Sequence, residues 1–239
     1  MDSRPTLILD LKSSHIPASS TTSMTGAVKF YDLLSIHPKV WWSPNTYKTR
    51  FVLNYKRIPY TIVGIHYPDI EETSKSLGLG PSDRRPTWTL PIIEYEGSVV
   101  RGSFGIAKFL DSKFPERPIV GIECEKWQEY VRKTLVPAMW PMTGPMVPSI
   151  LDQRDQEFFR RTRILPERED NHAKVVEAMW PMVRGIKEGG YIYGNEVHYA
   201  DLVLGSILVW MLRTKEEDFE KVVKAADILD WWKDISQYM

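Results

Sequence analysis

Apolar side chains in the first half of the chain change their spacing several times, and each change marks a new secondary-structure element. Residues 28–34 and 60–67 are short apolar and aromatic runs, which is the pattern of buried strands. Between them, the apolar residues of segment 47–55 recur at the three- and four-residue spacing of a helix. The two strands are therefore predicted to be parallel, with the helix as the crossover between them.

The following segments complete a recognisable order of elements. Residues 90–103 contain two apolar runs joined at Glu96 and Gly97, which predicts a β-hairpin. Ser103 is the predicted N-cap of another helix, which stops before Pro115. The order strand, helix, strand, loop, strand, strand, helix is that of the thioredoxin-like fold.

Beyond Pro118 the strand patterns end and helical patterns replace them. Residues 199–212 are apolar almost all round, so this helix is predicted at the centre of a bundle. We expect a flexible leader or tag at 1–26, an α+β thioredoxin-like domain at 27–117 and an all-α helical-bundle domain at 118–239.

Charge and cysteine content exclude several classes of function. Lys plus Arg and Asp plus Glu number 31 each, so no net charge attracts a nucleic acid or an acidic membrane. Cys124 is the one cysteine, which excludes a disulfide framework, a cysteine-rich metal site and a CxxC redox pair within one chain. A signal peptide and a membrane span are not predicted. We therefore expect a cytoplasmic protein without a metal site and without a nucleic-acid or membrane partner.

The start of the first helix carries the candidate chemistry. Ser43 is a favourable N-cap, and Pro44 suits the first helical position. Thioredoxins carry a cysteine pair here, whereas Ser43 and Thr46 are able only to hold the thiolate of another molecule. A hydrogen bond to a charged acceptor contributes about 1.5–3 kcal/mol and the helix N-terminus about 1 kcal/mol, enough to lower a thiol pKa of about 8.5 by one to two units. Taken alone, Ser43 is more simply an ordinary N-cap, but its context favours the thiolate.

Three segments together resemble the glutathione S-transferase superfamily, and within it the fungal etherase-related, serine-type group. They are WSPNTYKTRFVLNYKRIPY at 42–60, TLP at 89–91 and RGSFGIAKFLDSKF at 101–114. The resemblance extends from about residue 28 to residue 239 and is best in the first half. It implies glutathione as the cosubstrate, a hydrophobic small molecule as the second substrate, and a homodimer.

The resemblance also implies roles for residues that would hold glutathione. Ser43, or Asn45 through its side-chain amide, would contact the sulfur. Leu90 would offer its backbone groups to the cysteinyl part, in front of a cis bond to Pro91. Cis X–Pro bonds make up only about 5–6% of all X–Pro bonds, so the sequence alone does not predict this one.

The γ-glutamyl carboxylate of glutathione would bind at the start of the next helix. Ser103 and the backbone N–H groups of Ser103 and Phe104 would hold it there. Gly102 departs from the relatives, which usually carry a carboxylate at this position, and the departure weakens the expected hold on the glutamyl ammonium. Arg101 is a further candidate for a carboxylate of glutathione, although solvated surface charge is its simpler role.

The pentapeptide AMWPM occurs twice, at 138–142 and 178–182. Proline kinks a helix, and a kink opens a groove beside methionines and a flat indole. The simpler interpretation is kinked core packing, which we favour for the second copy. The first copy, together with the loop before Ser43, is predicted to form a hydrophobic substrate wall of Trp41, Trp42, Met139, Trp140, Met142 and Met146.

Two classes of function remain open at this point. The first is a glutathione transferase that aims the thiolate at a hydrophobic electrophile, with conjugation, ether cleavage or cis/trans isomerisation of a secondary metabolite as the net reaction. The second is a binding protein that sequesters hydrophobic phenolics or natural products with little turnover, which Gly102 favours. A regulator that kept the fold and lost the chemistry is a third possibility.

Overall fold

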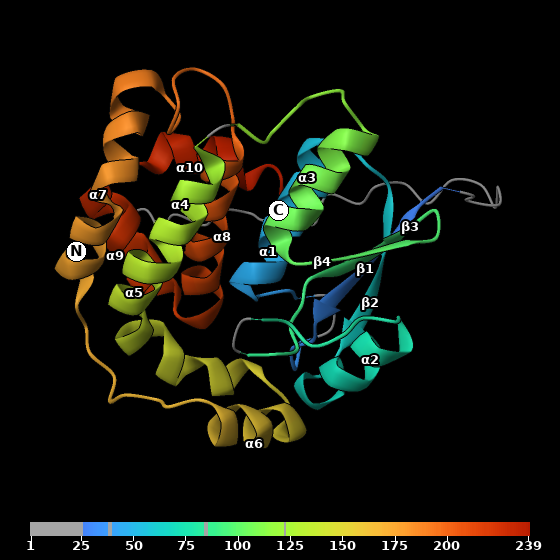
Figure 1. Cartoon of the computed structure of the whole chain (residues 1–239). Helices are drawn as coiled ribbons and strands as arrows, with labels where there is room; N and C mark the ends of the chain where they lie inside the picture. Colours follow the sequence, from blue (N-terminus) through green and yellow to red (C-terminus); the bar gives the residue numbers. More distant parts are fainter. Residues whose placement is uncertain (1–25, 38–39, 84–85, 122) are drawn as a thin grey trace.

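A four-stranded mixed sheet forms the centre of the first half of the chain (Figure 1). The computed structural model describes residues 26–37, 40–83, 86–121 and 123–239, so nearly all of the predicted leader lies outside the described residues. The strand order is β2-β1-β3-β4, with β1 parallel to β2 and antiparallel to β3. The strands are β1 Val28–Leu33, β2 Tyr60–Ile65, β3 Ile92–Tyr95 and β4 Ser98–Arg101.

The predicted hairpin between β3 and β4 is confirmed. Tyr95 pairs with Ser98, so the turn has two residues. Glu96 has φ 47° and Gly97 has φ 76°, and positive φ at both central positions is the requirement of the type I′ turn that joins two twisted strands.

The helices of this half lie on both sides of the sheet. In Figure 1, α1 and α3 lie between the sheet and the helical half, and α2 lies on the other side. The parallel pairing of β1 with β2 through α1 confirms the predicted crossover. The elements are α1 Pro44–Tyr55, η1 Tyr67–Asp69, α2 Ile70–Ser76 and α3 Ser103–Lys113.

The second half is helical throughout its regular structure, as predicted. One long, irregular helical stretch opens it: α4 continues through a π-helical turn, η2, into α5, with Pro141 inside α5. Pro181 lies inside α7, the helix of the second AMWPM copy. The elements are α4 Cys124–Tyr130, η2 Val131–Leu135, α5 Val136–Thr143, η3 Gly144–Ile150, α6 Gln153–Thr162, α7 His172–Gly189, α8 Tyr199–Thr214, α9 Glu216–Ala226 and α10 Leu229–Ser236.

Helix α8 is the central helix that its apolar sequence predicts, and it joins the two halves. It packs against both α1 and α10: a Cβ on Gly205 would lie 3.3 Å from Phe51 Cε2 of α1 and 2.7 Å from Ile235 Cγ2 of α10. Its buried Asp201 accepts hydrogen bonds from the backbone N–H groups of Ile192 and His198 and from Trp231 Nε1. The close approach at Gly205 therefore fixes α1 against the helical half.

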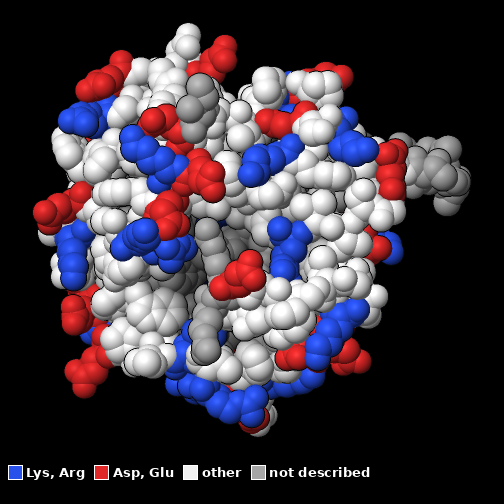
Figure 2. All heavy atoms as spheres, viewed as in Figure 1, with Lys and Arg blue, Asp and Glu red and all other residues white. Residues whose placement is uncertain are grey.

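Among the described residues, no helix combines the length and the apolar character that a bilayer crossing requires. Lys and Arg are interspersed with Asp and Glu over the face drawn in Figure 2, as the balanced composition predicts. Basic side chains gather at its lower edge, over α6.

Candidate functional site

The first helix begins at a serine whose hydroxyl does not cap it. Ser43 occupies the N-cap with φ −65° and ψ 125°, and its side chain makes no hydrogen bond to the helix backbone. Its carbonyl accepts from the N–H of Tyr47 at 2.9 Å and from Thr46 Oγ1 at 3.1 Å. The residue is 4% exposed, so its hydroxyl lies in a sheltered position beside the positive end of α1.

Asn45, two residues later, is held by a lysine of the same helix. Lys48 Nζ donates to Asn45 Oδ1 at 3.2 Å. This bond uses the amide oxygen as an acceptor, and the NH₂ group is the part of the Asn45 side chain that is able to donate to a ligand. Lys48 is buried, and desolvation lowers its pKa to about 8.

Ser43 and Asn45 line a cavity of about 600 Å³, which is within the usual range for small-molecule sites. Leu90 lies on the same cavity wall, and its bond to Pro91 is cis, as the resemblance implies. Residues of α2, of the segment before Pro91 and of α6 complete the walls. The lining residues are Leu33, Ser43, Asn45, Tyr67, Pro68, Ile70, Glu71, Pro86, Thr87, Trp88, Thr89, Leu90, Phe158, Thr162 and Arg163.

The second predicted helix start is displaced by one residue. Gly102, not Ser103, is the N-cap of α3, and its φ of 88° is easily reached only without a Cβ. Ser103 is the first helical residue, and its hydroxyl donates to Gln128 Oε1 at 3.5 Å. Gln128 Oε1 also accepts from the Tyr199 hydroxyl at 2.8 Å. The prediction of Ser103 as the N-cap is therefore wrong, because glycine takes the non-helical position.

Comparison with known proteins adds to this geometry. Residues 42–113 match the family profile "Glutathione S-transferase, N-terminal domain", and residues 125–238 match "Glutathione S-transferase, C-terminal domain". The "Glutathione S-transferase-like protein ustS" of Aspergillus flavus is 30% identical, over 85% of this chain and 87% of that protein. The chain belongs to the glutathione S-transferase family.

Solved structures of fungal glutathione transferases share the fold. GSTFuA3 of Phanerochaete chrysosporium superposes with a TM-score of 0.80 at 26% identity, over 89% of this chain and 97% of that one. CsGST63524 of Ceriporiopsis subvermispora, solved in complex with glutathione, gives a TM-score of 0.78 at 26% identity and the same coverage. The resemblance to the fungal group inferred from the sequence is confirmed.

Four of the residues expected to hold glutathione, Pro91, Arg101, Ser103 and Phe104, do not line the cavity of this glutathione S-transferase. Ser103 and Phe104 are at the start of α3, where the Phe104 ring lies 5.4 Å from the ring of Tyr199. Arg101 Nη1 donates to the carbonyl of Gly80 at 2.7 Å. Their roles toward glutathione stay predictions.

The predicted substrate wall on α5 is not part of the cavity. Met139 and Met142 are 0% exposed and belong to the helical core, because α5 packs against both α7 and α8. Trp140 is half-buried, and its Nε1 donates to the carbonyl of Ile164 at 3.1 Å. Met146, in η3, is half-buried and does not line the cavity. The first AMWPM copy thus has the packing role that we favoured for the second.

The two tryptophans before Ser43 support the loop instead of lining the cavity. Trp42 is 2% exposed, and its Nε1 donates to the carbonyl of Leu34 at 3.1 Å. Trp41 stacks on Arg50, whose Cζ lies 4.9 Å from the ring centroid. Arg50 in turn pairs with the buried Asp32 of β1 at 2.6 Å. These contacts fix the position of Ser43 relative to the sheet.

The aromatic part of the cavity comes from residues that the sequence did not single out. Tyr67 of η1 and Phe158 of α6 stack with ring centroids 6.0 Å apart and an interplanar angle of 18°. Trp88 lies on the same wall. Phe158 sits in a strongly charged amphipathic segment that is typical of a surface helix, so no local signal distinguished it.

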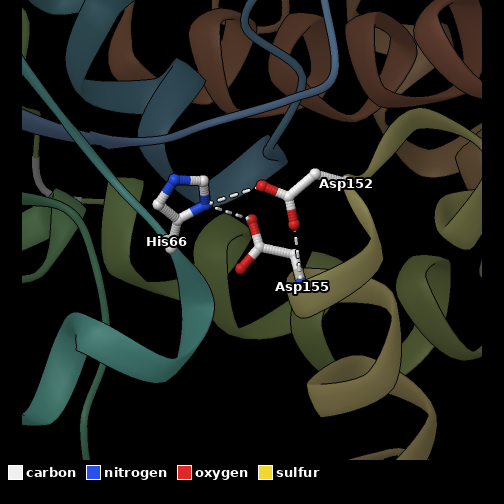
Figure 3. Close-up of side chains that lie close together, drawn as sticks. All are labelled: His66, Asp152 and Asp155. Carbon is white, nitrogen blue, oxygen red and sulfur yellow. Dashed lines mark hydrogen bonds and ion pairs between the residues drawn. The ribbon is translucent and has the colours of Figure 1, made fainter.

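A histidine–carboxylate cluster fastens α6 beside the cavity (Figure 3). His66, between β2 and η1, has its Nδ1 2.9 Å from Asp155 Oδ2 and 3.0 Å from Asp152 Oδ2. Asp155 also accepts from the N–H of Tyr67 at 2.7 Å, and Arg154 pairs with Asp69. The cluster thereby positions the stacked rings of Tyr67 and Phe158.

Proposed function

We propose that this glutathione S-transferase binds glutathione with its sulfur at the N-terminus of α1 and delivers the thiolate to a hydrophobic electrophile. One observation carries the proposal: Ser43, whose hydroxyl does not cap α1, lines a cavity together with Asn45 and Leu90. A glutathione complex of a relative that is 26% identical supports the choice of ligand.

The acidity of the thiol follows from the surroundings of Ser43. A hydrogen bond to a charged acceptor contributes about 1.5–3 kcal/mol, and the helix terminus adds about 1 kcal/mol. Each pKa unit corresponds to about 1.4 kcal/mol, so these contributions together lower a thiol pKa of about 8.5 by about two to three units. Conjugation, ether cleavage and double-bond isomerisation all begin with attack by this thiolate.

Replacement of the hydroxyl tests the proposal. In Ser43→Ala we expect kcat/KM toward an aryl chloride to fall about tenfold to a hundredfold, because one charge-assisted hydrogen bond is lost. The pKa of bound glutathione, followed by thiolate absorbance against pH, should return toward about 8.5. Asn45→Ala is the parallel variant. If Ser43→Ala leaves both quantities unchanged and Asn45→Ala lowers them, the sulfur contact belongs to Asn45.

A binding protein with little turnover is the second candidate. Gly102 replaces the carboxylate of the relatives, and Ser103 donates to Gln128, so the expected glutamyl site is weaker than in the family. At a hundredfold excess over its dissociation constant, a ligand of the folded state adds about 2.7 kcal/mol of stability. The midpoint of thermal unfolding tests this candidate. A midpoint that millimolar glutathione leaves unchanged and phenolic ligands raise would favour a binding protein.

We also infer a homodimer and a place in secondary metabolism or detoxification, both by analogy with the family. Light scattering of the purified chain tests the first, and a screen of aryl ethers and conjugated natural products tests the second. Neither inference affects the argument at Ser43.

A further inference from the structure

The cavity also has a wall from the second half of the chain, which we call its α6 end. Phe158, Thr162 and Arg163 line it from α6 and the residue that follows α6. Ser43 and Asn45 line it from the other half of the chain. A ligand bound in front of the thiol would therefore extend toward the α6 end.

Arg163 is a guanidinium without a carboxylate partner in the part of the chain that the structure describes. Its Nη1 donates to the carbonyl of Thr162 at 3.2 Å, and its Cζ lies 5.9 Å from the centroid of the Phe159 ring. The residue is half-buried. By contrast, Arg154 in α6 pairs with Asp69. A partly buried guanidinium with open donor positions is a site for a planar anion.

The other charged side chain on the cavity wall does not neutralise Arg163. Glu71 of α2 pairs with Lys75 at 2.7 Å. Figure 2 shows basic side chains gathered over α6, at the lower edge of the face. Among the described lining residues, Arg163 is thus the basic side chain of the cavity wall, and it has no ion pair there.

The aromatic rings that line the cavity together with Arg163 favour the binding of a planar ligand. Tyr67 and Phe158 stack at 18°, and Trp88 lies on the same cavity wall. Burial raises the pKa of Tyr67 well above its ordinary value, so its phenol stays neutral and does not compete for the guanidinium. Aromatic faces and one cation together fit an aromatic or conjugated anion.

We propose that the second substrate carries a carboxylate on an aromatic or conjugated frame, and that Arg163 binds this carboxylate while the electrophilic carbon faces Ser43. The proposal rests on the proposed function, since it assigns the electrophile of the same site. A carboxylate is also present in glutathione itself, so the experiment must separate the two sources of the anion.

A matched pair of probes measures the contribution of the carboxylate. The thiolate of glutathione displaces chloride from 4-chloro-3-nitrobenzoate and from the neutral 4-chloro-3-nitrobenzamide in the same way: a carbon–sulfur bond forms, the carbon–chlorine bond breaks, and chloride leaves with its electron pair. We expect kcat/KM to be higher for the benzoate. In Arg163→Gln, kcat/KM should fall at least tenfold for the benzoate and change less than twofold for the benzamide. In Arg163→Lys, the loss of kcat/KM for the benzoate should be intermediate.

Arg161→Gln is the matched control, because Arg161 is exposed, lies over the Phe158 ring at 5.7 Å and does not line the cavity. It should leave both probes unchanged. Equal losses for the two probes in Arg163→Gln, accompanied by a raised KM for glutathione, would overturn the proposal and assign Arg163 to a carboxylate of glutathione. No change for either probe would also overturn it.

Calorimetry separates this proposal from the proposed function. Titration of the protein with each probe in the absence of glutathione requires no turnover. Tighter binding of the benzoate, lost in Arg163→Gln and kept in Arg161→Gln, supports the anion site even if the protein proves to be a binder without turnover. Equal affinities for the benzoate and the benzamide would contradict the proposed anion site at Arg163 without testing the proposed role of Ser43.

Discussion

Lys48 shows the conflict between burial and charge at the scale of one residue. Lys48 is a buried residue of α1, and its Nζ donates to Asn45 Oδ1 at 3.2 Å. Among the described residues, no carboxylate lies within 4.0 Å of this ammonium. Desolvation lowers its pKa from 10.5 to about 8. The arrangement holds Asn45 ready for a ligand at a cost in stability.

The cost of burying Lys48 depends on pH in a defined direction. The folded-state pKa of about 8 lies below the unfolded value of 10.5, so the unfolded chain binds the proton more strongly in this window. The free energy of unfolding should therefore rise with pH between about 8 and 10.5. In Lys48→Met this contribution should be absent, and stability at pH 7 should be about 2 kcal/mol higher after the lost hydrogen bond is counted.

Urea unfolding at several pH values, compared between the variant and the parent protein, measures the effect. Lys113→Met, at an exposed position of α3, is the control and should follow the parent. A lower stability of Lys48→Met at pH 7, with an unchanged pH slope, would show that the ammonium is not penalised by burial.

At the scale of elements, two helical glycines differ in what surrounds them. In α8, an added Cβ at Gly205 would lie 2.7 Å from Ile235 Cγ2, whereas at Gly105 in α3 it would meet nothing within 4 Å. Alanine at Gly205 should lower the free energy of unfolding by about 1–3 kcal/mol through overpacking. Alanine at Gly105 should raise it by about 0.5–1 kcal/mol through helix propensity.

Urea unfolding of both variants gives the comparison. Equal stabilisation by the two alanines would mean that α8 has room to move away from α10, which contributes Ile235, and from α1, which contributes Phe51. That outcome would contradict the close packing that joins the two halves.

The order of elements was predictable from the sequence because it depends on local patterns. Alternating apolar runs and the Glu96–Gly97 turn placed the strands, and Ser43 with Pro44 placed the start of α1 correctly. Ser103 was misplaced by one residue, because a glycine before a serine offers two possible caps and only the backbone of Gly102 decides between them.

The cavity walls were less predictable, because they depend on which helices meet in space. Met139 is an apolar, flexible side chain of the kind found in substrate walls, yet in α5 it faces the core and is fully buried. Phe158 and Arg163 lie in a segment with the pattern of a solvated helix, and they reach the cavity only because α6 packs against η1. No spacing rule within the sequence encodes that contact.

At the scale of the whole molecule, Asp155 links the two halves below the cavity. Its carboxylate is 1% exposed and accepts from both His66 and the N–H of Tyr67. Replacement by alanine leaves the N–H of Tyr67 without its acceptor and His66 with Asp152 as its remaining carboxylate, so we expect a loss of about 2–4 kcal/mol in the free energy of unfolding. The KM for the aromatic substrate should also rise, because Tyr67 and Phe158 lose their alignment.

Arg154→Gln provides the comparison at the same interface. Its ion pair with Asp69 is largely exposed, so removal should cost less than about 1 kcal/mol. Urea unfolding together with substrate kinetics distinguishes the two variants. Equal small losses would show that α6 is held by its apolar contacts alone.

The two ends of the cavity are contributed by different halves of the polypeptide. In the function that we propose, Ser43 and Asn45 of the first half hold the sulfur, and Phe158 and Arg163 of the second half contribute to the surface that meets the electrophile. A chimera that exchanges the carboxyl-terminal half between two members of the family should therefore inherit its nucleophile from one parent and its selectivity from the other. Such an arrangement lets a lineage acquire new substrates while its reactive centre is conserved.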